Sequence, residues 1–395
     1  MSVYEDSLML HEKHRGKLET VSKVKINNKD DLSLAYTPGV AEPCKMIKEN
    51  PEDVYKYTTK GNVVAVITDG TAVLGLGDIG PKAALPVMEG KSILLKRFAN
   101  IDSFPLCLDT KDPEEIIKTC KYLSPSLGAI NLEDISAPRC VFIERRLIEE
   151  LDIPVFHDDQ HGTAIVISAA VINCCRLTGK KIENLKVVLS GTGAAGSAIA
   201  RMLKKLGVKT IYANNINGVV KSKNYDLYDF LVKELIDNGV LDDPEDDATF
   251  ESLFVGADLF VGVSASNIVT EEMIKSMNEK CFVFPMANPT PEISYEKAKN
   301  AKAFIVGTGR SDFPNQINNL LAFPGIFRGA LDAKATVINE DMKLAASYAI
   351  ANLIKDDELR PDYIVPSPFD ERVVDAVSKS VKDIAIKNHL TRSDL

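Results

Sequence analysis

Two pairs of acidic residues follow predicted strands and could hold a metal ion. Glu133 and Asp134 come directly after the apolar run AINL, and Asp158 and Asp159 come after PVFH. In parallel sheets, ligands collect where the strands end. Carboxylates that converge there need a cation to relieve their repulsion, and all-oxygen ligands select Mg²⁺ or Mn²⁺. We therefore expect a Mg²⁺ or Mn²⁺ site at this edge of the sheet.

Two other interpretations of these acids stay open. A single acidic pair is more often a helix N-cap or a solvated turn, and only its repetition at consecutive strands favours a metal. Zinc is the second alternative, because His157 and His161 are four residues apart. However, His157 falls on a predicted strand end and Gly162 follows His161, which argues against a shared helical face.

The motif G-x-G-x-x-G occurs twice, at Gly75–Gly80 and at Gly191–Gly196. The first copy is followed at once by Pro81, and we interpret it as tight turns or a loop that lines the substrate cleft. The second follows the apolar run LKVVLS, opens a predicted helix over Ser197–Leu206 and precedes the strand TIYAN. This complete βαβ unit predicts a dinucleotide whose pyrophosphate lies at the helix N-terminus. The predicted cofactor-binding residues of the turn are Gly191, Thr192, Gly193, Ala194, Ala195 and Gly196.

The end of the second strand of this unit indicates which nicotinamide dinucleotide binds. An acid there bonds the ribose 2′-OH of NAD and repels the 2′-phosphate of NADP. Here the positions read Asn214 and Asn215, and Lys221 and Lys223 follow shortly after. We therefore expect NADP to be preferred. NAD is the alternative, with Asn214 bonding the 2′-OH and the lysines solvated.

The elements that position these residues alternate between strands and helices, which is typical of an α/β fold with parallel sheets. The pattern predicts an N-terminal α/β substrate domain over residues 1–157 and a Rossmann-type parallel-sheet domain over residues 158–395. C-terminal helices over Asp341–Ile354 and Glu371–Lys387 are expected to pack back, in part onto the first domain. The predicted strands are Val63–Thr68, Phe104–Leu108, Ala129–Leu132, Pro154–Phe156, Lys186–Leu189, Thr210–Ala213, Leu259–Val263, Cys281–Pro285 and Phe304–Val306.

The break between the two domains is expected near His157–Gly162, just before a long helix over Thr163–Leu177.

Composition narrows the classes of protein further. The formal net charge of −9 over 395 residues argues against nucleic acid as a partner. We find no bilayer span and no secretory signal, and the seven cysteines form no CxxC pair, so we expect reduced thiols in the cytoplasm.

Two further residues could take part in proton transfer. Lys91 lies in the stretch MEGKSILL, and Tyr36 lies in SLAYTPGVAEPC. Alone, each is more often structural, as a snorkelling lysine or a tyrosine that anchors a loop. Together with ITDGTAVLGLGDIGPKAALP, NLEDI, VFHDDQHGTA, GTGAAG, MANPTPE and NNLLAFPG, these segments occur in an order that resembles the compact malic enzymes of prokaryotic type. The resemblance runs from about Ser33 to Gly325.

The resemblance implies metal-dependent oxidation of L-malate to oxaloacetate, decarboxylation to pyruvate, and reduction of NAD(P). The catalytic residues it implies are Tyr36, Lys91 and Asp158, and the metal ligands are Glu133, Asp134 and Asp159. Substrate binding falls on Lys91, Asn288, Asn318 and Asn319, and Ser264 and Asn288 are assigned to the cofactor site. Larger relatives carry an arginine just before LGLGD that holds a malate carboxylate. Here that place reads Thr71-Ala72, so the carboxylate must be held otherwise.

The residues also fit this chemistry on their own. Lys91 can take the proton of the C2 hydroxyl only if it is neutral, and a metal cation and apolar walls would both lower its pKa. Tyr36 could protonate the enol left after CO₂ departs. We expect the cleft between the domains, where Tyr36 and Lys91 meet Asp158, Asp159 and Asn288, in a homodimer or larger homo-oligomer.

Three alternatives share many of these features. A malate-to-lactate (malolactic) enzyme has the same motifs but retains its NAD and reduces the product again. A metal-dependent oxaloacetate decarboxylase would carry a vestigial dinucleotide site, which the intact glycines Gly191, Gly193 and Gly196 argue against. A nucleotide-sensing binding protein would not need Tyr36 and Lys91.

Overall fold

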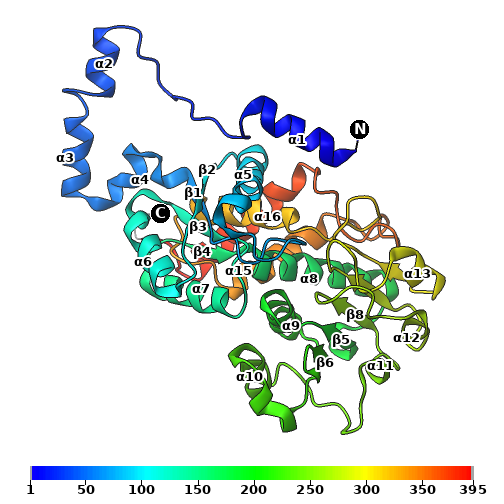
Figure 1. The fold of residues 1–395 in the computed structure, drawn as a ribbon. Coiled ribbons are helices and arrows are strands. Elements are labelled where there is room, and N and C mark those ends of the chain that lie inside the picture. The colour runs from blue at the N-terminus through cyan, green and yellow to red at the C-terminus, as the bar shows by residue number, and fades with distance from the viewer. Residues whose placement is uncertain (1, 393–395) are drawn as a thin grey trace.

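Two parallel β-sheets follow one another along the chain and are covered by helices (Figure 1). The computed structural model describes residues 2–392. The first sheet has the order β2-β1-β3-β4, and all its pairings are parallel. Its strands are β1 (Val63–Thr68), β2 (Asp102–Cys107), β3 (Ala129–Leu132) and β4 (Val155–His157). The helices between them are α5 (Gly80–Ala99), α6 (Pro113–Leu123) and α7 (Arg139–Glu150).

The second sheet has the order β10-β9-β8-β5-β6-β7 and is parallel except for the β6–β7 pair. Its strands are β5 (Lys186–Ser190), β6 (Thr210–Asn215), β7 (Gly218–Val219), β8 (Leu259–Gly262), β9 (Phe282–Pro285) and β10 (Ile305–Val306). The helices between them are α9 (Ala194–Leu206), α10 (Phe230–Asp237), α11 (Phe250–Leu253), α12 (Glu271–Lys275) and α13 (Tyr295–Asn300). The α/β class with a Rossmann-type second sheet is confirmed.

The helix α8 (Asp158–Thr178) connects the two sheets. It is long and apolar enough to cross a membrane, but 72% of its apolar window is buried inside the protein, as in the core helix of a soluble domain. It starts before the predicted Thr163, because Asp158 and Asp159 occupy its first turn, where the helix dipole favours carboxylates. The expected domain break near His157–Gly162 therefore falls inside the first turns of this helix.

The C-terminal helices pack back, as expected. They are α14 (Phe323–Asp332), α15 (Glu340–Asn352) and α16 (Arg372–Lys387). Helix α15 contacts α8, and α14 contacts α5 of the first half of the chain. Their buried side chains form one continuous core with α8 and the second sheet, so the tail ties the two halves together.

The N-terminal arm, residues 2–50, differs from the rest of the chain. It contains α1 (Val3–His14), α2 (Lys29–Ala35) and α3 (Ala41–Glu49), and none of the residues in these three helices is buried. In Figure 1, α2 and α3 stand away from the body. The arm exposes large apolar side chains, which include Val3, Tyr4, Leu8, Val21, Leu34 and Tyr36. A surface of this kind is expected where another chain docks.

Short elements complete the description. Helix α4 covers Val54–Tyr57, and the 3₁₀ turns are Pro51–Asp53, Thr59–Asn62, Ser124–Ser126, Ile182–Asn184, Ser222–Leu227 and Asn319–Leu321.

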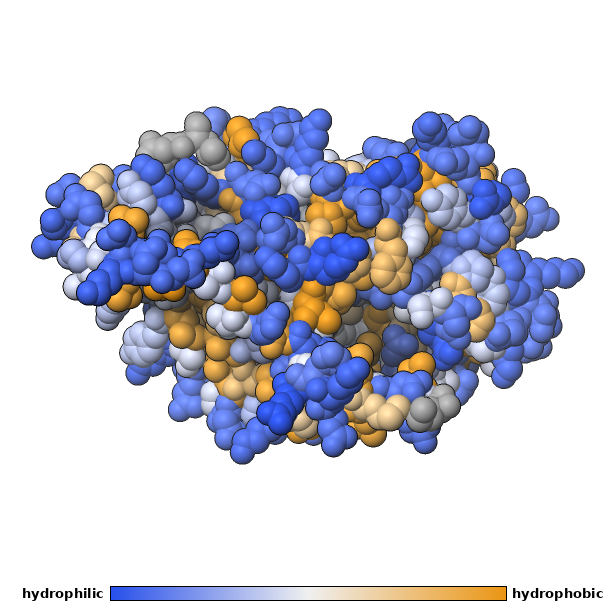
Figure 2. Space-filling view, turned by 90° about the horizontal axis from the view of Figure 1, so that it is seen from above, coloured by the Kyte–Doolittle hydropathy of each residue, from blue (hydrophilic) through white to orange (hydrophobic). Residues whose placement is uncertain are grey.

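All seven cysteines are free, and five of them are buried, which fits the expected reduced thiols. Seen from above, hydrophilic residues cover most of the surface, and hydrophobic side chains gather in patches between them (Figure 2).

Candidate active site

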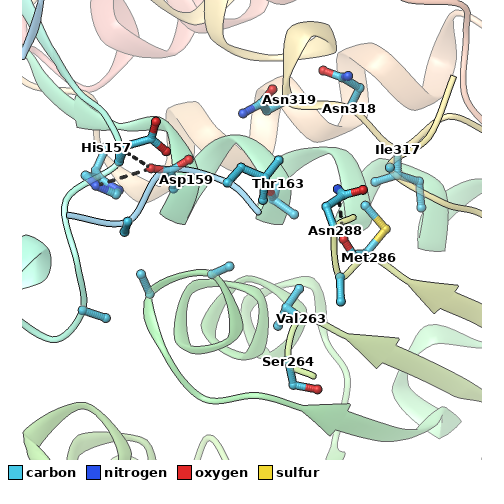
Figure 3. A pocket seen from close by; sticks show the side chains of 18 of the residues that line it. His157, Asp159, Thr163, Val263, Ser264, Met286, Asn288, Ile317, Asn318 and Asn319 are labelled. Carbon is cyan, nitrogen blue, oxygen red and sulfur yellow. Dashed lines mark hydrogen bonds and ion pairs between the residues drawn. The ribbon is translucent and has the colours of Figure 1, made fainter. Parts of the chain in front are cut away.

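A cavity of about 470 Å³ receives side chains from both halves of the chain. His157 and Asp159 lie at one end, and Asn288 and Asn318 lie toward the other (Figure 3). Eight of the predicted site residues line this cavity: Asp134, Asp159, Ala194, Ala195, Ser264, Asn288, Asn318 and Asn319. Residues more than 180 positions apart are therefore brought to one place, because α8 and the strand ends of the second sheet face each other here.

The acids Glu133, Asp134 and Asp159 form the predicted metal cluster. One carboxylate oxygen from each lies within 4.8 Å of the others. The backbone N–H of Asp134 donates to Asp159 Oδ2 at 2.8 Å, and Asp134 Oδ2 is buried without a hydrogen-bond partner in the described part of the chain. Asp134 has a φ of 53°, in the left-handed region that costs energy for a residue other than glycine. The local backbone is thus held in a form that directs this carboxylate into the cluster.

Burial and mutual repulsion make these carboxylates costly when ionised. Burial first, and then the neighbouring charge of Asp159, raises the pKa of Asp134 to about 7. Burial likewise raises the pKa of Glu133 well above its ordinary value, with the charge of Lys91 opposing the shift. An orphaned buried oxygen and an all-carboxylate donor set are what a hard divalent cation relieves. The residues present fit Mg²⁺ or Mn²⁺.

Lys91 on α5 is buried beside this cluster. Its Nζ lies 2.6 Å from Asp158 Oδ2 and 2.9 Å from Glu133 Oε1, and it lies 4.3 Å from the centre of the Phe323 ring. Burial lowers the pKa of Lys91, but the charges of Asp158 and Glu133 outweigh burial and hold it above its ordinary value. Burial thus acts on the pKa of Lys91 in the expected direction, but burial by itself does not make the amine neutral.

The asparagines take up distinct places around Lys91. The Asn319 amide contacts Asp158 Oδ2, the same oxygen that binds Lys91. Asn318 caps the 3₁₀ turn Asn319–Leu321 by accepting from Leu320 N at 2.9 Å. Asn288 lies on the opposite wall, where its amide donates to Met286 O at 3.4 Å. Asn319 thus contacts the partner of Lys91, while Asn288 and Asn318 line the main cavity.

The turn Gly191–Gly196 has the geometry that a dinucleotide needs. Gly191 has a φ of 98°, and a Cβ there would lie 2.6 Å from Val263 O. A Cβ at Gly196 would collide with the carbonyl of Gly191, so α9 packs close to β5 only with glycine here. At Gly193 the nearest atom to such a Cβ is 4.0 Å away, and this residue caps α9 without a side-chain hydrogen bond. The open backbone and free helix N-terminus fit a pyrophosphate.

A second cavity of about 540 Å³ extends from this turn. It is lined by Gly191, Thr192, Gly193, Asn214, Asn215 and Ser264, and it shares Ala137 and Ser264 with the first cavity. Lys221 and Lys223 do not line it. Lys221 Nζ donates to Asp246 O at 2.7 Å, and Lys223 pairs with the Asp246 carboxylate at 2.7 Å. The part of the NADP argument that rested on these lysines is therefore wrong, because both ammonium groups are held elsewhere.

Tyr36 is not brought to the cleft. It ends α2 on the N-terminal arm, is 66% exposed and lines neither cavity. The expectation that Tyr36 meets Lys91 within one chain is therefore wrong. Local sequence could not show this, because the position of an arm depends on what it packs against.

Glu292 is a site residue that the sequence analysis missed. Its side chain is fully buried, with Oε1 accepting from Ser264 N at 2.7 Å and Oε2 from Ala287 N at 3.1 Å. It therefore holds together the loops after β8 and β9 that line the main cavity. Its position at the end of the MANPTPE block was the only signal in the sequence.

Two adjoining cavities define a class of protein. Asp134 and Asp159 of the carboxylate triad line the first cavity, and the Rossmann turn lines the second. Lys91 binds Glu133 of the triad but does not itself line either cavity. Dehydrogenases that bind a nicotinamide dinucleotide and a divalent cation combine these features.

Comparisons with known proteins narrow the class to a family. Residues 15–148 match the family described as "Malic enzyme, N-terminal domain", and residues 160–387 match "Malic enzyme, NAD binding domain". A bifunctional malic/malolactic enzyme of Bacillus subtilis is 53% identical, over 99% of this chain and 95% of its own length. An NAD-dependent malic enzyme of Geobacillus stearothermophilus is 51% identical, over 96% and 78%. The crystal structure of an NAD-dependent malic enzyme from Thermotoga maritima superposes with a TM-score of 0.91 at 48% identity, covering 95% of this chain and 99% of that one. The chain belongs to the malic enzyme family.

Proposed function

We propose that the protein catalyses the oxidative decarboxylation of L-malate to pyruvate and CO₂ with reduction of NAD(P). The observation that carries this proposal is the placement of the Lys91–Asp158 pair against the acidic triad, of which Asp134 and Asp159 line the main cavity. That cavity shares Ser264 with the cavity that extends from the dinucleotide turn. Glu133, Asp134 and Asp159 would hold the divalent cation, and Gly191–Gly196 would hold the pyrophosphate. When bound, the cation supplies Lewis-acid stabilisation of the C2 oxygen, and the dinucleotide accepts the hydride.

In this mechanism Lys91 takes the proton of the malate C2 hydroxyl. Lys91 must be neutral to do so, and a cation held by Glu133, Asp134 and Asp159 would lower the pKa of Lys91 by offsetting their charge. Asp158 keeps Lys91 in place and accepts a hydrogen bond from its ammonium form. Asn319 orients Asp158, and the buried position of Lys91 keeps water away from the proton.

Larger relatives bind a substrate carboxylate with an arginine. At that position this chain has Thr71 and Ala72 instead. Ala72 lines the main cavity, so the space is left to the substrate itself. We assign Asn288 and Asn318 as the amide donors that bind the carboxylates, with Lys91 beside them. This arrangement uses neutral donors in place of one guanidinium.

We keep Tyr36 as the proposed proton donor to the enol, but we propose that it acts at the cavity of a second copy of the chain. The arm that carries it exposes apolar side chains and buries none in its helices, so it is suited to dock on a second copy of the chain. We assign the protein as a homodimer in which the arm of one copy brings Tyr36 to the cavity of the other.

The choice of dinucleotide follows from the second cavity. Asn214 and Asn215 present no charge to a 2′-phosphate. Of the lysines that could attract one, Lys221 donates to the backbone carbonyl of Asp246 and Lys223 pairs with the Asp246 carboxylate. Asp229 also lines this cavity, with its carboxylate at the N-terminus of α10. In place of the NADP preference expected from the sequence, we propose that NAD is used at least as well as NADP.

The division of the chain at residues 157 and 158 is kept as a proposal, because the two sheets lie on either side of it. Free cysteines, five of them buried, suit a reducing compartment such as the cytoplasm.

One assay tests the proposal. Purified protein is given L-malate with NAD or NADP, with Mn²⁺ or with a chelator, while reduced nicotinamide is followed by absorbance and the products are separated. We expect reduced dinucleotide and pyruvate in equal amounts, and only with the metal. Lactate without net reduced dinucleotide would indicate the malolactic reaction. Pyruvate from oxaloacetate alone, with no reaction from malate, would indicate a decarboxylase.

A further inference from the structure

A buried acid on α7 binds the turn that carries two of the catalytic carboxylates. Glu144 is 3% exposed and lines neither of the cavities described above. Its Oε1 accepts from the backbone N–H of His157 at 2.8 Å, and its Oε2 accepts from Gln160 Nε2 at 3.1 Å. His161 Nε2 lies 3.0 Å from the same Oε2. All three partners belong to the first turn of α8 or to the residue before it.

Between these three anchored residues lie Asp158 and Asp159. Asp158 binds Lys91, and Asp159 belongs to the acidic triad. Fixing residues 157, 160 and 161 leaves the backbone of the two acids little freedom to turn. We propose that Glu144 is a positioning residue that fixes the start of α8, so that Asp159 points to the metal site and Asp158 points to Lys91.

The charge of Glu144 suits this task. Burial raises the pKa of Glu144, but the hydrogen bond from His161 and the charge of Lys343 oppose burial and lower the pKa to about 2, so the side chain is ionised at neutral pH. An ionised carboxylate only accepts hydrogen bonds, and bonds to a charged acceptor are stronger than neutral ones. Each of the three groups around Glu144 is one that can donate.

The same contacts continue to the C-terminal part of the chain. His161 Nδ1 lies 3.1 Å from Lys343 Nζ, and Lys343 also binds Glu340 Oε1 at 2.8 Å. Because Lys343 can only donate, His161 Nδ1 accepts and Nε2 donates to Glu144, which fixes the ring tautomer. Helix α15 thus supports the turn from the side opposite α7.

Stability alone does not explain this cluster. A buried carboxylate pays for its loss of hydration, and buried ion pairs can often be replaced by apolar residues without loss of stability. Glu144 instead binds the residues on either side of Asp158 and Asp159, the two acids assigned to the site. Groups that orient metal ligands typically change metal affinity or activity by about 10- to 100-fold when they are removed.

Glu144→Gln tests the proposal, with Glu149→Gln on the exposed face of the same helix as the matched control. The glutamine keeps the shape but turns an amide NH₂ toward groups that donate. Mn²⁺ affinity is measured by the paramagnetic resonance of free Mn²⁺, dinucleotide affinity by NADH fluorescence, and folding by circular dichroism. We expect Mn²⁺ to bind about 10- to 100-fold more weakly in Glu144→Gln, with NADH affinity within about twofold of the parent. Glu149→Gln should match the parent in both.

The inference rests on the proposed metal site, and the experiment separates the two. If the parent protein binds no Mn²⁺, the metal site itself is wrong. If the parent binds Mn²⁺ and a folded Glu144→Gln binds it equally well, the positioning role is wrong.

Two milder variants decide the matter if Glu144→Gln does not fold. Gln160→Met removes one donor and keeps the side-chain volume, and Glu144→Asp keeps the charge but withdraws the acceptor. Each should bind Mn²⁺ more weakly than the parent protein and leave NADH binding unchanged. Unchanged Mn²⁺ affinity in both variants would overturn the proposal.

Discussion

At the scale of single residues, the site is governed by how charge is compensated. Lys91 lies near three carboxylates, Asp158, Glu133 and Asp159, and their charges hold its pKa above the ordinary value. The pKa values of Asp134 and Glu133 are also raised, because burial and repulsion from neighbouring carboxylates disfavour their ionised forms. If Lys91 is the base and the triad holds the metal, as proposed, the same carboxylates affect both proton transfer and metal binding.

Replacing Lys91 by alanine should remove the group that takes the hydroxyl proton. We expect Lys91→Ala to lower kcat for malate oxidation by about 10²- to 10⁴-fold, the usual contribution of general base catalysis. NADH binding, measured by fluorescence, should stay unchanged, and so should the activity of Lys82→Ala on the exposed face of the same helix. Turnover within a factor of a few of the parent would remove Lys91 from the mechanism.

The raised pKa of Asp134 predicts how the metal stabilises the protein at different pH values. The folded protein binds this proton more tightly than the unfolded chain, because the pKa rises from 3.8 to about 7. The resulting stability is fully present below about pH 4 and is lost as the pH rises through about 7. A cation competes with that proton, so Mn²⁺ should raise the Tm more at about pH 8 than at about pH 6.

Thermal melts with Mn²⁺ and with a chelator at both pH values measure this difference. In Asp134→Asn, which has no proton to release there, the gain from Mn²⁺ should be smaller and depend less on pH. An equal or larger gain for the parent at the lower pH would contradict the predicted competition.

Ile216 offers a test of the dinucleotide preference. It lines the second cavity beyond Asn215 and is 99% exposed, so a longer side chain fits without repacking. Ile216→Arg places a guanidinium near the 2′ position, where no lysine reaches. We expect kcat/KM for NADP to rise by up to about fivefold relative to NAD, since an exposed ion pair contributes up to about 1 kcal/mol. Ile216→Gln is the uncharged control, and a parent that strongly favours NADP would contradict the proposal directly.

At the scale of elements, glycine positions and strand ends decide where ligands bind. The turn between β5 and α9 brings the helix close to the strand because Gly196 has no side chain. The acids at the ends of β3 and β4 meet because these strands are neighbours in a parallel sheet. Both placements follow from short-range pattern, and the predicted β1 and β3 have the same bounds in the structure.

Gly196→Ala tests the turn. The added methyl group would overlap the carbonyl of Gly191 and force α9 away from β5. Overpacking of this kind costs about 1–3 kcal/mol, so NAD should bind at least about fivefold more weakly in the variant. Mn²⁺ affinity should be unaltered, because the triad lies on other elements. NAD affinity equal to that of the parent in a folded variant would show that the turn does not hold the dinucleotide.

Other features of the elements were not readable from local pattern. Helix α8 was expected from Thr163, because Gly162 and the paired acids look like a loop. In the structure the acids begin the helix, and Glu144, which is 13 residues before His157, binds its first turn. A residue that stabilises a helix from another helix leaves no periodic signal in the sequence.

At the scale of the whole molecule, the N-terminal arm is the feature that a single chain leaves unexplained. Its helices bury no residue, yet they carry Tyr36 and a series of apolar side chains. A homodimer in which each arm serves the cavity of the other copy accounts for both observations.

Co-expression of two inactive variants tests this arrangement. A heterodimer of Tyr36→Phe and Lys91→Ala contains one cavity with both wild-type residues if Tyr36 acts between copies, and none if it acts within a chain. We expect the heterodimer, isolated with two different tags, to recover about half of the parent's activity. Each variant alone should lose about 10²- to 10⁴-fold. A heterodimer as inactive as its parents, or a monomeric parent protein in light scattering, would contradict the proposal.

Short sequence patterns were enough to predict the α/β class, the dinucleotide turn at Gly191–Gly196 and the acids at one sheet edge. These follow from patterns a few residues long, because a βαβ unit and the ends of neighbouring strands are encoded locally. The charges around Lys91, the contacts of Lys221 and Lys223 with Asp246, and the exposure of Tyr36 away from the cavity became visible only in the folded chain. Each of these depends on which distant segments pack together, and local sequence does not encode that packing.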